Sequence, residues 1–199
     1  SYINGWTMSL NGLIWESSKT PKGQRFNAQG ITGCVTIYNS ELVDTSLAIS
    51  NGQCEDSLNL INTTATQIKI KINDSYADAV DADFSSLEID SLEISNAGND
   101  CFDVSGGRYF VTTADLKGCG DKGLSIGEKS SFKGDVISIE KASIGVSAKD
   151  YSQAFIRHLS IKNTITCGEA KRKKQEFGGG VLHIEKTNCS EKYFSDNES

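Results

Sequence analysis

The chain has 199 residues, and its 20 Lys and Arg residues against 26 Asp and Glu residues give a formal net charge of −6. This acidic balance argues against nucleic acid as a partner, because phosphate binding requires a basic face. No apolar run approaches the roughly 18 residues of a membrane span, and a chain of this length can bury the core of a single domain.

Residues 1–30 contain both tryptophans, Trp6 and Trp15, and the single proline, Pro21, but no clear repeat. We expect this segment to form an irregular first coil and a cap, because exposed strand edges at the end of a fold invite edge-to-edge pairing. The tryptophans could instead stack on a sugar ring. Since the chain starts at Ser1 without Met or a signal segment, we expect it to be part of a larger exported protein.

Residues 31–189 contain an internal repeat of 22 residues, which is clearest from Glu55, where the sequence reads EDSLNLIN. The corresponding segments follow at intervals of 22 residues and read ADAVDADF from Ala77, NDCFDVSG from Asn99, DKGLSIGE from Asp121, SIGVSAKD from Ser143 and the more degenerate ITCGEAKR from Ile165. A fixed period of roughly 20 to 50 residues is the signature of a solenoid.

Each repeat contains two short stretches with the alternation of β-strands, in which every second side chain points inward. The first stretch carries the pairs Leu58 and Leu60, Val80 and Ala82, Phe102 and Val104, Leu124 and Ile126, Val146 and Ala148, and Gly168 and Ala170. The second stretch carries Ile70 and Ile72, Leu92 and Ile94, Ala114 and Leu116, Ile137 and Ile139, and Leu159 and Ile161. The second stretch drifts by one residue between repeats, which indicates a turn of variable length.

No repeat has a helical stripe or the Leu-x-x-Leu-x-Leu frame of a leucine-rich repeat, and the residues between the stretches suit turns. We therefore predict an all-β chain that forms a single-stranded right-handed parallel β-helix. This solenoid has about 22 residues per coil, with coils about 4.8 Å apart. The N-terminal cap occupies residues 1–30, the β-helix occupies 31–189, and a polar tail occupies 190–199.

The six cysteines fall into pairs spaced by roughly one coil, with 20 residues between Cys34 and Cys54, 18 between Cys101 and Cys119, and 22 between Cys167 and Cys189. Each pair could meet and form a disulfide, which would fit an oxidising compartment. Stacked cysteines could equally be small inward-facing residues. Zinc is not expected, because no spacing is Cys-x-x-Cys and only His158 and His183 are available as imidazole ligands.

Several segments also resemble a known family. The runs ADAVDADFS, GNDCFDVSGG, CGDKGLSIGEKS, IGVSAKDYS and KRKKQEFGGG are similar to the β-helix region of exported bacterial β-helix repeat proteins, some of which are linked to a spore-coat-kinase-like domain. The resemblance covers about residues 31–189. It implies a parallel β-helix and a distant relation to pectate lyases, polygalacturonases and alginate epimerases. Cys101 replaces a Gly usual in the family, and Gln175 replaces a Pro; the first change favours a disulfide at Cys101.

Outward positions of the first strand gather acidic residues on one face. One column holds Asp81 and Asp103, its neighbour holds Asp83, and the preceding turn contributes Asp78 and Asp100. Asp81 and Asp103 would stand near 5 Å apart, about one strand spacing, where two carboxylates repel unless one is protonated or a cation lies between them. Three interpretations follow. Asp81, Asp83 and Asp103 form a Ca²⁺ site, an acid and base pair for glycosidic cleavage, or part of a solvated acidic stripe.

Toward the C-terminal coils the same face becomes basic. It presents Lys122 and Lys149 beside Ser125 and Glu128, and then the run Lys171, Arg172, Lys173 and Lys174. We expect this run to bulge from the coil as a loop, because four consecutive charges cannot alternate inward. A long face with acidic and basic zones suits an extended polymer, and salt bridges between coils would explain the same charges.

We predict an extracytoplasmic β-helix module, secreted or at the cell surface, that binds or presents to a polysaccharide through this aspartate-rich face. The expected ligand-binding residues are Asp78, Asp100, Lys122, Ser125, Glu128 and Lys149. The alternative is a polysaccharide lyase, epimerase or hydrolase with Asp81, Asp83 and Asp103 as its catalytic residues. A lyase or epimerase would also need a basic group, such as Lys122, Lys149 or Arg108. A third interpretation is a structural spacer, and Ca²⁺ is the one cofactor considered.

Overall fold

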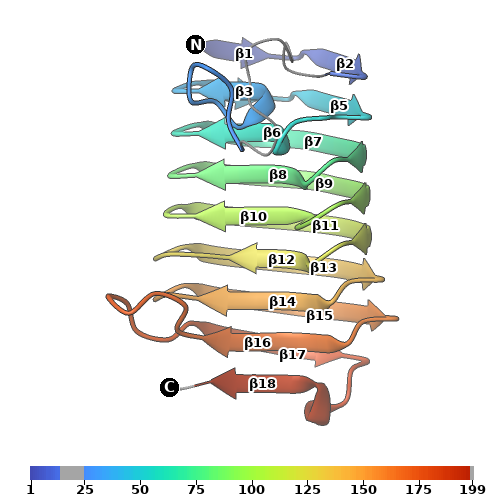
Figure 1. Ribbon diagram of the computed structural model, residues 1–199, viewed down its shortest axis with the longest axis vertical. Coiled ribbons are helices and arrows are strands. Elements are labelled where there is room, and N and C mark those ends of the chain that lie inside the picture. Colours follow the sequence, from blue (N-terminus) through green and yellow to red (C-terminus); the bar gives the residue numbers. More distant parts are fainter. Residues whose placement is uncertain (14–24, 198–199) are drawn as a thin grey trace.

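The computed structural model describes residues 1–13 and 25–197. The described chain is almost entirely β-structure, wound into a parallel β-solenoid of about seven turns with about 22 residues per turn. Figure 1 shows the coils stacked along the long axis, with the two termini at opposite ends. The predicted parallel β-solenoid is confirmed. Within the described residues, no helix combines the length and the apolar character needed to cross a bilayer.

The strands form two parallel sheets that run along the solenoid. The long-strand sheet contains β1 (Tyr2–Asn4), β2 (Thr7–Asn11), β4 (Glu41–Val43), β5 (Ser46–Ser50), β7 (Thr64–Ser75), β9 (Ser86–Ala97), β11 (Arg108–Cys119), β13 (Ser131–Glu140), β15 (Gln153–Lys162) and β17 (Val181–Thr187). The short-strand sheet contains β3 (Gly33–Tyr38), β6 (Asp56–Ile61), β8 (Asp78–Asp83), β10 (Phe102–Ser105), β12 (Lys122–Ile126), β14 (Ile144–Lys149), β16 (Thr166–Lys171) and β18 (Phe194–Asn197).

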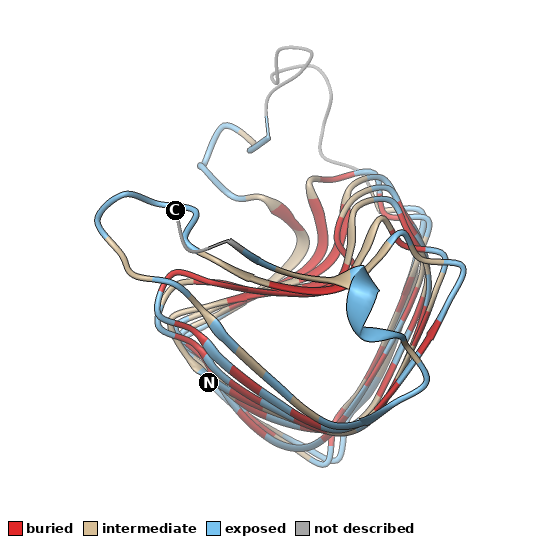
Figure 2. Cartoon of the chain, turned by 90° about the horizontal axis from the view of Figure 1, so that it is seen from below, coloured by how far each residue is buried: buried red, intermediate tan, exposed pale blue. Residues whose placement is uncertain are grey.

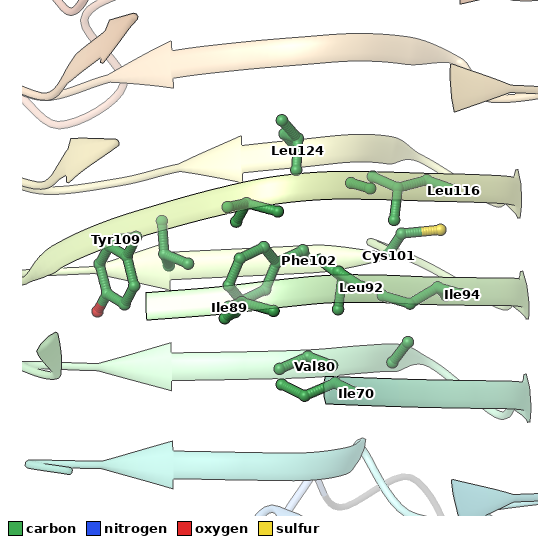
Figure 3. Close-up of a cluster of buried hydrophobic side chains, with 14 of the residues drawn as sticks. Ile70, Val80, Ile89, Leu92, Ile94, Cys101, Phe102, Tyr109, Leu116 and Leu124 are labelled. Carbon is green, nitrogen blue, oxygen red and sulfur yellow. The ribbon is translucent and has the colours of Figure 1, made fainter. Parts of the chain in front are cut away.

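The core is a set of apolar columns between the two sheets. Phe102 of β10 lies opposite Val80 of β8 and Leu124 of β12, so residues 22 positions apart stack directly. Figure 3 shows these three side chains on successive coils within the buried cluster. The predicted inward pairs are buried throughout, with the exception of Ala170 in the last full coil, which is half-buried. The alternation in the sequence therefore identified the core correctly.

The turns vary in length, as the drift of the second strand indicates. Leu116 of β11 pairs with Ile139 of β13, which lies 23 rather than 22 positions later, because the turn between β12 and β13 has an additional residue. The next turn, between β13 and β14, is shorter by one residue. Ser125 and Ser147 therefore pair again at an offset of 22 residues, and the short-strand sheet stays in register.

The corner that leads into the short strands admits only small side chains. In one coil the Ser57 hydroxyl donates a hydrogen bond to Ser75 Oγ at 2.7 Å. Two coils later the same positions hold cysteines that form a disulfide, with Cα atoms 5.3 Å apart. All six cysteines are paired as the spacing suggested, in the disulfides Cys34–Cys54, Cys101–Cys119 and Cys167–Cys189.

The N-terminal segment is more regular than the sequence suggested. Strands β1 and β2 pair in parallel with β4 and β5, so they add a turn to the long-strand sheet. Their inward side chains Met8 and Leu10 pack against the core, which explains the regularity. The Trp6 side chain is 57% exposed and does not cover the end of the core. Trp15 and Pro21, the other residues assigned to the cap, lie outside the described residues.

The C-terminal segment also differs from the expected polar tail. The 3-10 helix η1 (Glu191–Tyr193) is followed by β18, which pairs in parallel with β16. Phe194 packs against the end of the core, so these residues close the last coil instead of fraying. The basic run behaves as predicted, because β16 ends at Lys171 and the chain then leaves the sheet as a loop before β17.

Candidate functional site

The outer face of the short-strand sheet brings the predicted carboxylates together. Asp81 of β8 lies directly opposite Asp103 of β10, and Asp83 lies opposite Ser105 on the same pair of strands. Neighbouring parallel strands are about 4.8 Å apart, so the carboxylates of Asp81, Asp83 and Asp103 belong to one cluster, here called the carboxylate trio. All three side chains are partly exposed. The stacking on which the site prediction depends is therefore present.

Partial withdrawal from water raises the pKa values of the carboxylate trio. Burial first, and then the negative charges of Asp83 and other nearby carboxylates, raise the pKa of Asp81 to about 9. Burial also raises the pKa values of Asp83 and Asp103 above their usual range, and mutual repulsion adds to the effect at Asp83. Asn59 Nδ2 donates a hydrogen bond to Asp81 Oδ2 at 3.0 Å. At neutral pH Asp81 therefore retains its proton, and its titration is coupled to that of the neighbouring carboxylates.

A buried lysine lies beside the trio. Lys149 is 5% exposed, and its Nζ donates a hydrogen bond to the hydroxyl of Ser125 at 2.7 Å. Burial lowers the pKa of Lys149, and the negative charge of Asp103 opposes that shift. In turn, a hydrogen bond from Ser125 and the charge of Lys149 limit the rise in the pKa of Asp103. Lys149, Ser125 and Asp103 thus form a polar chain across three coils.

Two of the expected ligand-binding residues, Asp78 and Asp100, hold successive coils together. Asp78 Oδ1 accepts hydrogen bonds from the backbone N–H of Asp100 at 2.8 Å and from Asn99 Nδ2 at 2.7 Å. Asp100 Oδ1 accepts the backbone N–H of Lys122 at 2.9 Å and lies 3.5 Å from Lys122 Nζ. Burial raises the pKa of Asp78 to about 7. Asp78, Asp100 and Lys122 therefore have structural partners within the solenoid.

Glu128, another expected ligand-binding residue, is also engaged. It forms an ion pair with Lys174 from the basic loop and accepts a hydrogen bond from the hydroxyl of Ser105 at 2.9 Å. Burial acts to raise the pKa of Glu128, but the hydrogen bonds from Lys174, a backbone N–H and Ser105, together with the charge of Lys174, outweigh it and lower this pKa to about 2. Glu128 consequently stays ionised and links the β12–β13 turn to the loop.

Two segments project on the side of the short-strand sheet. Figure 2 shows residues 25–32 and the loop of residues 172–180 rising beyond this sheet, on the side away from the core. The first segment is tied to the coil by an ion pair of 2.6 Å between Arg25 Nε and Glu55 Oε1. The second is tied by Asp150 Oδ1, which accepts the backbone N–H groups of Lys173 and Lys174 at 2.7 and 2.9 Å. Both segments are thus held against the coils that carry the site.

Exposed aromatic rings line the edge where the short strands end. Tyr38, Phe84 and Tyr151 are 66%, 69% and 56% exposed. Tyr151 also makes an edge-to-face contact with Phe177 of the basic loop, with ring centroids 6.0 Å apart. We call Tyr38, Phe84, Tyr151 and Phe177 the aromatic edge. These rings were not singled out from the sequence, although Tyr38 is the last residue of β3, Phe84 directly follows β8 and Tyr151 lies two residues after β14.

The donor set for a cation is limited. Within residues 1–13 and 25–197, no group of three or more His, Cys, Asp or Glu side chains is arranged to hold a metal ion. A carboxyl group that retains its proton at neutral pH, such as that of Asp81, is also a poor Ca²⁺ ligand until the cation displaces the proton. Asp81, Asp83 and Asp103 remain the predicted Ca²⁺ ligands, and the tests below include Ca²⁺ for that reason.

Comparisons with known proteins do not assign a function to this site. A scan against protein-family models found no match, and searches of curated proteins and of solved structures found none either. The parallel β-solenoid is therefore established by the structure itself.

Proposed function

We propose that this protein is a glycan-binding solenoid, with the outer face of the short-strand sheet as its ligand surface. The observation that supports this most strongly is the coincidence of two features along one straight side. The carboxylate trio lies on the strands, and the aromatic edge runs beside it, with Tyr38, Phe84 and Tyr151 more than half exposed. Exposed aromatic rings bordered by polar groups are typical of interaction surfaces, because one end of each ring is apolar and the surroundings are hydrated.

The spacing of the aromatic edge suits an extended chain. Tyr38 and Phe84 are separated by two coils, which corresponds to about 10 Å, and Phe84 and Tyr151 are separated by three coils, about 14 Å. Beyond Tyr151 the face continues with Lys171 and Lys174. A polymer lying along the axis would thus meet an acidic zone, aromatic rings and a basic zone in succession. Convergent polar groups favour a binding face over a structural spacer.

A second candidate function is glycoside hydrolysis by the same carboxylates. The observation that favours it is the pKa of about 9 at Asp81, in register with Asp103 on the next strand. At neutral pH, protonated Asp81 would donate a proton to the leaving oxygen, and ionised Asp103 or Asp83 would act as the base or nucleophile. Lyase or epimerase chemistry would instead use Lys149 or Arg108 as the basic group.

An extracytoplasmic location, secreted or at the cell surface, is part of this proposal. All six cysteines are paired in disulfides, which form and persist in oxidising compartments. Kinship with exported bacterial β-helix repeat proteins is the corresponding proposal about origin, and the segments named in the sequence analysis support it.

Binding to a glycan array, with and without Ca²⁺, tests the proposal. The parent is compared with Asp81→Asn and Asp103→Asn, and with Asp90→Asn as a control, because Asp90 is exposed on the long-strand sheet. We expect the two site variants to lose about tenfold in affinity, because Asn replaces a carboxyl oxygen that can accept a hydrogen bond with an NH₂ group that cannot. Equal binding by all four proteins would remove the carboxylate trio from the ligand surface.

Turnover separates binding from catalysis. The glycans that bind are incubated with the parent, and products are followed as new reducing ends and as absorbance from an unsaturated sugar. New reducing ends that disappear in Asp81→Asn would establish the hydrolase. An unsaturated product would establish a lyase, and unchanged glycan would leave the binding function.

A further inference from the structure

Phe84 occupies a backbone conformation that suits other residues far better. At the corner after β3, β6, β8 and β10 the backbone is left-handed, with φ of +48° at Asn39, +48° at Asn62, +51° at Phe84 and +64° at Gly106. Asn and Gly tolerate this conformation, whereas a bulky side chain in it is an outlier. The chain thus keeps an aromatic residue where its own neighbouring coils use Asn or Gly. Such local conflicts concentrate at functional sites.

The Phe84 ring is exposed to solvent and is not packed in the core. It is 69% exposed and lies against Gly106, because a Cβ atom on that glycine would come within 2.7 Å of Phe84 Cδ1. Because Gly106 has no side chain, the Phe84 ring can lie directly against its backbone. The strain at Phe84 is therefore not offset by burial of the ring.

A hollow of about 350 Å³ opens beside this ring. Its lining includes the side chains of Phe84, Arg108, Lys129, Asn62, Thr64 and Ser86, and the described residues around it include no Asp or Glu. Arg108 and Lys129 are exposed, and within the described chain neither forms an ion pair, although Lys129 Nζ lies 5.6 Å from the centre of the Phe177 ring. The nearby Glu128 is already paired with Lys174. The hollow thus combines two cations without a carboxylate partner, hydroxyl and amide groups, and an aromatic wall.

We propose that this hollow binds an anionic sugar unit, with the ring of the sugar against Phe84 and its carboxylate or sulfate group on Arg108 and Lys129. Guanidinium groups match such oxyanions with paired N–H donors, and Asn62, Thr64 and Ser86 can bond the sugar hydroxyls. This inference rests on the proposed glycan-binding function and assigns it a ligand class. The polymer would then place its charged unit at this corner and pass the carboxylate trio with less acidic units.

The test is affinity for neutral, uronate-containing and sulfated glycans on one array. Arg108→Ala combined with Lys129→Asn removes the cations, and Asn is chosen because it tolerates the left-handed backbone at Lys129. Phe84→Asn copies Asn39 and Asn62 at the same corner, so it should fold at least as well as the parent. Lys133→Ala is the control, because Lys133 is an exposed lysine of β13 outside the hollow.

We expect the parent to prefer anionic glycans, and the double variant to lose about tenfold or more of that affinity. Phe84→Asn should lose about three- to tenfold while its thermal midpoint stays level or rises. Lys133→Ala should match the parent, and high salt should reproduce the effect of the double variant. Preference for uronate or for sulfate in the parent then identifies the anionic group.

The inference is overturned if the parent prefers neutral glycans, or if the double variant binds anionic glycans as the parent does. It is also overturned if an oligonucleotide of similar charge binds as tightly, since attraction would then be purely electrostatic. Failure of the proposed function looks different. In that case the parent binds no glycan on the array, neutral or anionic, whereas failure of this inference alone leaves glycan binding by the parent intact.

Discussion

The outer faces of the two sheets follow the same repeat and yet differ in their relation to water. On the long-strand sheet, outward side chains such as Lys71 and Glu93 are more than half exposed, and they pair across strands at 3.0 Å. On the short-strand sheet, outward side chains such as Asn59, Ser147 and Lys149 are at most 5% exposed. Polar residues occupy both faces, but only the short-strand face withdraws them from solvent.

This difference distinguishes exposed charges, which contribute little to stability, from buried charges, whose pKa values are shifted. Exposed ion pairs are screened by water and salt, so each contributes little and its loss is tolerated. Withdrawal from water disfavours the charged form of a group, which raises the pKa of Asp81 and lowers that of Lys149. In a regular solenoid, function is therefore expected where the environment, more than the residue type, departs from the repeat.

The largest expected effect concerns the corner that joins the two faces. Replacing Cys101 and Cys119 together with Ala should lower the free energy of unfolding by about 3 kcal/mol, because the disulfide restricts the unfolded chain. The preceding coil holds Ala79 and Ala97 at the same positions, so the replacement fits the folded state. Urea unfolding of both proteins measures the loss, and coincident unfolding curves would contradict it.

The next effect contrasts a buried with an exposed aspartate. Asp100→Ala should cost about 1–3 kcal/mol, because it leaves the buried N–H of Lys122 without an acceptor. Asp90→Ala, on the exposed face, should change stability by less than about 0.5 kcal/mol. Thermal unfolding of the two variants checks the contrast. Similar losses at both sites would show that the two faces are energetically alike.

A pH series addresses the carboxylate trio. The folded-state pKa of Asp81 is about 9, against about 3.9 in an unfolded chain. Its contribution to stability is therefore fully present below about pH 4 and is lost as the pH rises through about 9. Asp81→Asn, which mimics the protonated form, should match the parent near pH 4. At pH 9 it should be more stable by at least about 1.4 kcal/mol, the equivalent of one pKa unit. Parallel stability curves for parent and variant across this range would refute the raised pKa.

The smallest effect is expected at the exposed ion pair. Lys71→Ala should change the free energy of unfolding by less than about 0.5 kcal/mol, and the difference should vanish at high salt. A double-mutant cycle with Glu93→Ala measures the pair itself. A coupling free energy as large as the loss in Asp100→Ala would show that solvent and salt do not screen the Lys71–Glu93 ion pair.

The repeat made most of the fold predictable. Apolar residues such as Leu92 and Ala114 recur at a constant spacing, so their columns could be assigned before the strands were seen, and the cysteine spacing led to the three disulfides. The ends could not be assigned in this way, because β1, β2 and β18 lie outside the repeat and form by packing Met8, Leu10 and Phe194 on the open core.

The site was only partly predictable for a related reason. Residue type and column placed Asp81, Asp83 and Asp103 together. Type alone could not distinguish them from Asp78 and Asp100, whose carboxylates accept backbone N–H groups of the next coil. The aromatic edge escaped notice because turn residues follow no hydrophobic period, and the conformation of Phe84 is visible only in the backbone.

The compensating turns on either side of β13 keep the perimeter of the solenoid constant. The residue added before β13 is given up after it, so every later short strand arrives with the same side chains facing out. A single uncompensated insertion would have turned the next strands over and moved their acidic and basic groups into the apolar interior. Lengthening this protein by engineering is therefore feasible in whole circuits, whereas lone added residues must be cancelled before the following strand begins.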